Sequence, residues 1–160
     1  MAEKTTLLIL RLEGILQSWG EMSKWDFRDT SELPTKSGIV GLLGCAMGLE
    51  RDDARLAELN KAIKIAIRAD RPGVRIVDFQ TVTGNPLRKA DGKPRANGNT
   101  IISKHAYLQD ASFTIVIETS PAWKFQIVSA LNNKFPAFLR VYTLLVLISR
   151  LKFSSSLPIC

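Results

Sequence analysis

The chain has 160 residues, 46% of them apolar, which excludes a largely disordered chain and fits one domain with a core of moderate size. Its formal net charge of +7 favours polyanionic partners, with nucleic acid first among them and a merely basic, soluble surface as the alternative. Two cysteines and one histidine exclude a disulfide framework and a metal centre, and the short apolar runs exclude a membrane span, so we expect a cytoplasmic protein with no metal, cofactor or membrane partner.

The first predicted element is a strand, because apolar residues recur at every second position over residues 8–12. A polar, aromatic loop follows over residues 14–29 and carries Trp19, Trp25 and Phe27. Interleaved aromatic and basic residues suit single-stranded RNA, whose bases stack on aromatic rings. The alternative, favoured for Trp25 and Phe27, is that these rings close the edge of a sheet.

A glycine-studded helix is predicted from about Ser37 to Gly48. Pro34 cannot continue a helix from upstream, and a Ser or Thr just after it is a natural N-cap. The amides of a first helical turn lack partners and carry a partial positive charge, so they can bind an anion. Lys36 and Arg28 add full charges, so a phosphate is the expected ligand and an ordinary capped helix is the alternative.

Two further features of this segment bear on its function. Thr30 and Thr35 occupy positions where a nucleotide-binding P-loop requires glycine, which excludes an NTPase. Each glycine inside the helix weakens it by ~1 kcal/mol relative to alanine. We therefore expect another backbone, or a ligand, to approach the helix closely at these glycines.

The later elements complete an α+β pattern. Asp52 or Asp53 can cap a second helix, and we interpret the pair as a cap and not as catalytic carboxylates. Residues 84–104 are rich in Lys, Arg, Gly and Pro and too long for a mere connector, so we expect them to be either functional or disordered. A basic hairpin arm that orders on nucleic acid fits both interpretations. The order of elements predicts a ferredoxin-like βαββαβ fold whose last strand comes from residues 141–148 and whose open sheet face could bind RNA. The other predicted elements are strands 64–69, 74–82 and 111–118, a turn at 71–73, and a helix from about Ser120 to Leu131.

His105 is the only histidine, next to Lys104 and two residues from Tyr107. A histidine base with a lysine that stabilises the developing charge could cleave RNA without metal, the 2′-hydroxyl being the nucleophile. The alternative is a structural histidine or one that contacts RNA.

Several blocks of sequence together resemble a known family. They are LILRLEGILQSWG (8–20), the segment 28–53 with PTKSGIVGLLG, DFQTVTG (78–84) and YLQDASFTIVIE (107–118). In this order they resemble the type I-E branch of the Cas-five family of CRISPR-associated proteins, within the RAMP superfamily. The resemblance runs from about Leu7 to Leu131 and implies a ferredoxin-like, RRM-related RAMP domain with an inserted β-hairpin thumb at about residues 84–104.

The resemblance implies a role in antiviral defence. Members of the family hold the 5′ handle of the CRISPR RNA (crRNA) in a Cascade complex, between a CasC-type backbone subunit and a CasA-type large subunit, and meet target DNA only through the complex. The type I-E members are not nucleases, whereas type I-C relatives cleave precursor RNA with a Tyr, Lys and His set. We therefore expect a non-catalytic crRNA-binding subunit. The alternatives are a metal-independent endoribonuclease that uses His105, Lys104 and Tyr107, and a remnant without affinity for the handle.

The resemblance assigns two sets of contacts to this chain. The handle site is expected at Gln17, Trp19, Lys24, Arg28, Thr30, Pro34, Thr35, Lys36, Ser37 and Gly38. The thumb is expected to contact RNA or a neighbouring subunit through Arg88, Lys89, Lys93, Arg95, Lys104 and His105. We expect residues 1–139 to form the domain and residues 140–160 to be a divergent tail, truncated or frameshifted, that lacks the family's C-terminal β region.

Overall fold

The computed structural model describes residues 5–22, 24, 26–84, 87–88, 91–94 and 100–133. The predicted last strand and tail lie outside the described residues, as do Trp25, Lys89 and Arg95. The elements are β1 (Thr6–Glu13), β2 (Leu16–Gln17), β3 (Phe27–Arg28), α1 (Lys36–Ala46), α2 (Ala54–Ala62), β4 (Lys64–Arg71), β5 (Val74–Thr83), β6 (Thr100–Gln109), β7 (Ser112–Thr119) and α3 (Pro121–Asn133).

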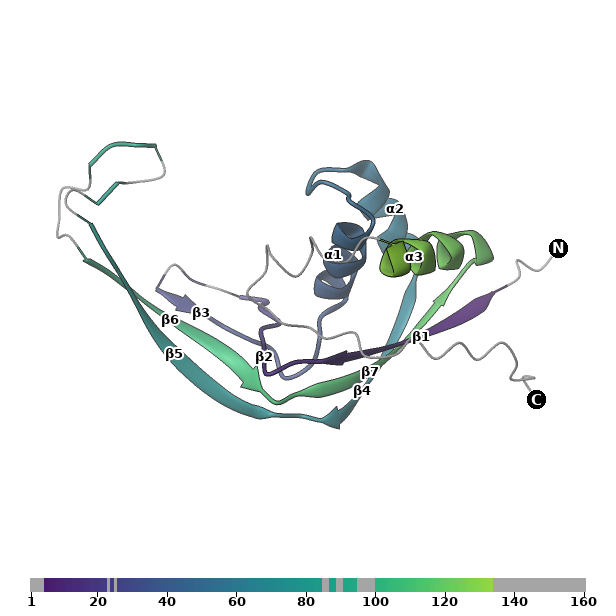
Figure 1. Cartoon of the computed structure of the whole chain (residues 1–160), viewed down its shortest axis with the longest axis horizontal. Helices are drawn as coiled ribbons and strands as arrows, with labels where there is room; N and C mark the ends of the chain where they lie inside the picture. Colours follow the sequence, from purple (N-terminus) through teal and green to yellow (C-terminus); the bar gives the residue numbers. More distant parts are fainter. Residues whose placement is uncertain are drawn as a thin grey trace.

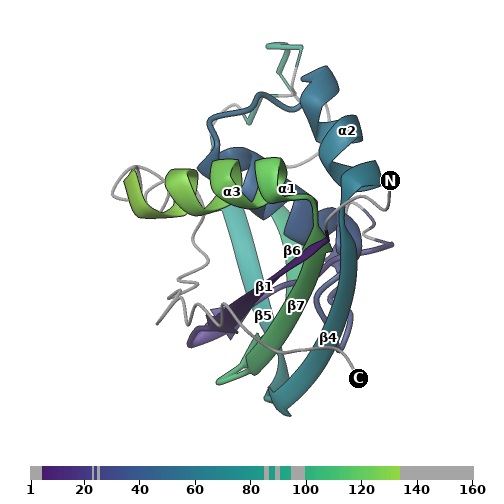
Figure 2. The same ribbon diagram turned by 90° about the vertical axis from the view of Figure 1, so that its right-hand side faces the viewer.

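The domain is built on an antiparallel sheet in the order β1-β7-β4. Helices α1 and α2 lie between β1 and β4 in the chain, and α3 follows β7. Figures 1 and 2 show that α1, α2 and α3 lie over the same face of the sheet. Alternate residues of β1 and β7 are buried against the helices, as the period-two pattern predicts. The fold is therefore ferredoxin-like in the described part of the chain. The largest side chains buried in this core are Leu10, Leu12, Ile39, Leu43, Leu59, Ile63, Phe113, Ile115, Ile117 and Ile127.

A long two-stranded arm extends from this sheet. β5 pairs antiparallel with β6 along its whole length, from Val74 opposite Gln109 to Thr83 opposite Thr100. On the other edge of β6, β2 pairs antiparallel and β3 pairs parallel. Figure 1 shows the arm leaving the domain on the side away from α3, with the described residues between β5 and β6 at its tip.

Two segments have more strand structure than the sequence pattern indicates. Residues 100–104, the last part of the predicted hairpin arm, form the first half of β6 and pair with β5. The predicted loop 14–29 contains the short strands β2 and β3, since both find a partner in β6.

The glycines of α1 face side chains where the sequence predicts a backbone or a ligand. A Cβ at Gly44 would lie 2.2 Å from Cδ2 of Leu56 on α2, and a Cβ at Gly38 would lie 3.1 Å from the ring of Trp19. Gly41 has nothing within 4 Å of such a Cβ. Two of these glycines therefore let a neighbouring side chain pack directly on the helix.

Candidate nucleic-acid interface

Helix α1 begins with the cap that the sequence predicts. Thr35 has an extended backbone, and its Oγ1 accepts a hydrogen bond from the Gly38 N–H over 3.1 Å. The amides of Lys36 and Ser37 have no acceptor inside the helix, and both residues are exposed. The first turn holds no acidic residue. This helix start can therefore bind an anion.

The start of α1 is joined to the arm by a short segment. Strand β3 places Arg28 beside His105 of β6, and the Lys104 N–H donates to the Asp26 carbonyl over 2.9 Å. Residues 29–35 then run from β3 directly to the cap of α1. Arg28 and Lys104, far apart in the sequence, thus lie on two paired strands, β3 and β6.

Part of the predicted handle site is buried. Gln17 is 0% exposed, Thr30 is 2% exposed and Trp19 is 5% exposed, and Pro34 is buried as well. The expectation that the Trp19 ring stacks on an RNA base needs correcting, because the ring packs on Gly38 and its Nε1 donates to Gln17 Oε1 over 3.2 Å. These four buried side chains position the loop and are not exposed to a ligand.

Thr30 holds the loop to Trp19 through the backbone. Its Oγ1 accepts from the Trp19 N–H over 2.8 Å, and the Ser31 N–H donates to the Trp19 carbonyl over 2.8 Å. Lys24, Arg28, Lys36 and Ser37 remain as exposed members of the predicted site.

The residues of the predicted nuclease lie on two faces of β6. Ser103, His105 and Tyr107 alternate along one face, with His105 Nε2 3.1 Å from Ser103 Oγ and the rings of His105 and Tyr107 stacked at 6.3 Å between centroids. Lys104 is adjacent to His105 in the strand and so projects from the opposite face. The prediction that Lys104 assists His105 at one catalytic centre is therefore wrong for this geometry.

The described cations near the arm tip stand in a small turn. Arg88 forms a β-bridge with Pro94, and Arg88 Nη1 donates to the Gly92 carbonyl over 2.9 Å. The Lys93 N–H donates to Asp91 Oδ1 over 3.1 Å, and Gly92 has a φ of 80° that closes the turn. Both cationic side chains are exposed.

Sequence reasoning missed a pair that ties the arm to the loop. Arg75 of β5 donates from Nη1 to the Thr30 carbonyl over 3.2 Å and forms an ion pair with Asp29. Asp29 also accepts from the Thr30 N–H over 2.8 Å. No local pattern marks this pair, because its members are 46 residues apart and meet only when β5 pairs with β6.

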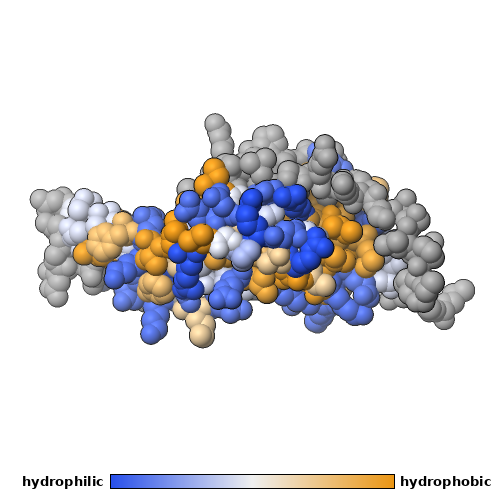
Figure 3. Space-filling model, turned by 90° about the horizontal axis from the view of Figure 1, so that it is seen from below, coloured by the Kyte–Doolittle hydropathy of each residue, from blue (hydrophilic) through white to orange (hydrophobic). Residues whose placement is uncertain are grey.

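The open face of the β1-β7-β4 sheet does not offer the aromatic platform that RNA-binding sheets use. Its described side chains include no aromatic ring, and its cations are held in ion pairs with neighbouring carboxylates. Figure 3, viewed from the side away from the helices, shows hydrophilic and hydrophobic side chains interleaved on this face. The pairs are Arg11–Glu13, Arg71–Glu13, Lys64–Glu118 and Arg68–Asp70.

These observations define a class: a ferredoxin-like domain with an inserted two-stranded arm and an exposed, Thr35-capped helix start. A family profile described as "CRISPR-associated protein (Cas_Cas5)" matches residues 7–134. The chain therefore belongs to the Cas5 family of CRISPR-associated proteins.

Comparison with individual proteins supports this family assignment. The CRISPR system Cascade subunit CasD of Escherichia coli (strain K12) is 36% identical over 125 residues, which cover 71% of this chain and 54% of that protein. A solved "CRISPR RNA-guided surveillance complex" contains a chain with 39% identity and a TM-score of 0.70, covering 81% of this chain and 55% of that one. A "Crystal structure of Cas protein" shows 34% identity and a TM-score of 0.59, covering 81% and 53%. The chain thus spans about half the length of these relatives. No helix of the described residues is long and apolar enough to cross a membrane.

Proposed function

We propose that this chain is a non-catalytic subunit of a type I-E Cascade complex that binds the 5′ handle of the crRNA at the start of α1 and along the arm. The relatives support the proposal, since one is named a Cascade subunit and another belongs to an RNA-guided surveillance complex. The observation that carries it is the Thr35-capped helix start, with exposed Lys36 and Ser37, attached through β3 to the arm.

Phosphate contacts supply the affinity in this proposal. The described exposed cations of the loop, helix start and arm are Lys24, Arg28, Lys36, Arg75, Arg88, Lys93 and Lys104, of which Arg75 is paired with Asp29. Each phosphate that such a cation neutralises releases a counterion, so the logarithm of the binding constant falls with the logarithm of salt concentration by about 0.7 per contact for single strands. A helix start that binds phosphate adds directional hydrogen bonds to this charge attraction.

Apolar side chains on one face of the arm support a protein contact as well. Val77, Phe79 and Ile102 are 54%, 57% and 52% exposed, and the register of β5 and β6 places them on the same face as Lys104. We assign this face to the adjacent CasC-type backbone subunit, with the CasA-type large subunit as the second neighbour. Target DNA is then reached only through the complex.

Substitution of Lys36 tests the helix start. Lys36→Ala is expected to weaken binding of a handle RNA by about 1.5–3 kcal/mol, the usual worth of a charge-assisted hydrogen bond, and to reduce the salt slope. Arg28→Ala is expected to act in the same direction. Fluorescence anisotropy with a labelled handle oligonucleotide at several salt concentrations measures both effects. Arg68→Ala, on the open face of the sheet, serves as the control and should bind like wild type; equal affinities for all three variants would remove the site.

A cleavage assay distinguishes the proposed RNA-binding function from the alternative, a metal-independent endoribonuclease. The two-face arrangement of Lys104 and His105 predicts that repeat RNA incubated with the protein in EDTA stays intact. Specific cleavage that disappears in His105→Ala would instead establish a metal-independent endoribonuclease.

A further inference from the structure

The arm and the domain meet at a kink where both strands break. Pro72-Gly73 separates β4 from β5, and Asp110-Ala111 separates β6 from β7. Gly73 has a φ of 79° and Asp110 a φ of 56°. A Cβ at Gly73 would lie 2.6 Å from the Gln109 carbonyl, so the two links pack tightly against each other. The direction of the arm is set at this kink.

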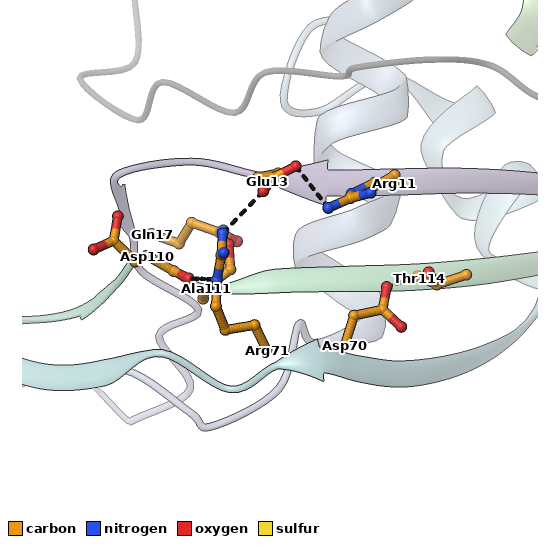
Figure 4. A network of polar contacts seen from close by, with 8 residues as sticks. All are labelled: Arg11, Glu13, Gln17, Asp70, Arg71, Asp110, Ala111 and Thr114. Carbon is orange, nitrogen blue, oxygen red and sulfur yellow. Dashed lines mark hydrogen bonds and ion pairs between the residues drawn. The ribbon is translucent and has the colours of Figure 1, made fainter.

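Side chains bind the carbonyls at the kink. Arg71 Nε donates to the Asp110 carbonyl, and Gln17 Nε2 donates to the Ala111 carbonyl over 2.7 Å (Figure 4). The Asp110 N–H donates to the carbonyl of Ile15 over 2.9 Å. Two successive carbonyls of the link between β6 and β7 thus accept hydrogen bonds from side chains of two other strands, β4 and β2.

Arg71 is itself fixed on the open face of the sheet. Its Nη2 donates to Glu13 Oε1 over 2.9 Å, and Arg11 Nη2 lies 3.0 Å from the other oxygen of Glu13 (Figure 4). The guanidinium therefore bridges β1 and the kink. A planar guanidinium donates from several nitrogens held at fixed angles, so it can bind two acceptors at once. A lysine ammonium has a single nitrogen and does not hold two acceptors in this fixed geometry.

Gln17 links the kink to the start of α1. Its amide is fully buried and uses both ends, since Oε1 accepts from Trp19 Nε1 while Nε2 reaches Ala111. The Trp19 ring in turn packs on Gly38 in the first turn of α1. A continuous set of buried contacts thus runs from the arm to the helix start.

We propose that Arg71 and Gln17 are positioning residues for RNA binding. They fix the direction in which the arm leaves the domain and, through Trp19, the place of the helix start relative to the arm. The inference rests on the proposed function, because it treats the helix start and the arm as two parts of one RNA site. Holding both parts in place before RNA arrives reduces the ordering cost of binding.

Distance measurements on the full chain test the mechanical part without RNA. In a Cys45→Ala, Cys160→Ser background, spin labels are placed by Asn60→Cys on α2 and Thr81→Cys on β5, both exposed positions. Arg71→Met is expected to broaden the distribution of distances between the labels. Arg68→Met is the matched control, because Arg68 lies on the same strand in an ion pair with Asp70 but makes no contact with the kink. A distribution as narrow in Arg71→Met as in wild type would overturn the proposal.

RNA affinity then distinguishes a positioning role of Arg71 from a direct effect of its charge. Arg71→Lys keeps the charge but loses the two-partner geometry, so we expect it to bind the handle RNA as weakly as Arg71→Met, about tenfold below wild type. Wild-type affinity in Arg71→Lys would overturn the positioning role. Failure of the wild-type chain itself to bind RNA would refute the proposed function, whereas the label distances would still decide whether the kink is clamped.

Discussion

The Gln17 side chain is fully buried and forms hydrogen bonds with both Ala111 and Trp19. A polar residue in an aromatic, basic loop is typical of an RNA contact, and the sequence predicts that role for it. Its hydrogen-bond acceptor, the Ala111 carbonyl, lies 94 residues further along the chain, so no local pattern could indicate that the amide is buried. The position of Lys36 and Ser37 at the exposed start of α1 could be predicted, because helix capping depends on a few neighbouring residues.

Removing the Gln17 amide tests its structural role. Gln17→Leu is expected to lower the free energy of unfolding by about 1–3 kcal/mol, because it leaves the Ala111 carbonyl and Trp19 Nε1 buried without partners. Gln109→Leu, at an exposed position of β6, is the control and should change it by less than about 0.5 kcal/mol. Urea denaturation measures both values, and equal effects of the two substitutions would argue against the buried amide.

For helices and strands, residue type alone predicts where a helix begins but does not predict which strands pair. Thr35 caps α1 and Asp53 caps α2, where Asp53 Oδ1 accepts from the Arg55 N–H over 2.9 Å; the Arg55 side chain also holds the pKa of this carboxyl below its usual value. Both caps follow from residue type. The stem of the arm does not, because residues 100–104 become a strand only through pairing with β5.

The glycines of α1 give a matched pair of substitutions. Gly41→Ala is expected to raise the free energy of unfolding by up to about 1 kcal/mol, because the position is exposed and an added methyl meets nothing. Gly44→Ala is expected to lower it by about 1–3 kcal/mol, because Leu56 must move out of the way. Thermal or urea unfolding of the two variants decides. A stabilising Gly44→Ala would show that α1 and α2 are not packed as described.

For the whole molecule, composition predicts the kind of partner but not the face that binds it. The order of elements and the alternating burial of β1 and β7 predict the ferredoxin-like fold, because they depend on which residues face the core. A net charge of +7 predicts a polyanionic ligand, yet charge carries no information about position. We propose that RNA binds at the helix start and the arm, because the cations of the open sheet face are already paired with carboxylates.

Chemical-shift mapping of backbone amides during titration with handle RNA tests this account most directly. The account predicts the largest shifts at Lys36, Ser37 and Gly38 and along β6 of the arm, with little change in the amides of Arg11, Thr114 and Arg68 on the opposite side of the domain. Shifts concentrated on the open sheet face, with the amides of the first turn of α1 unmoved, would contradict it.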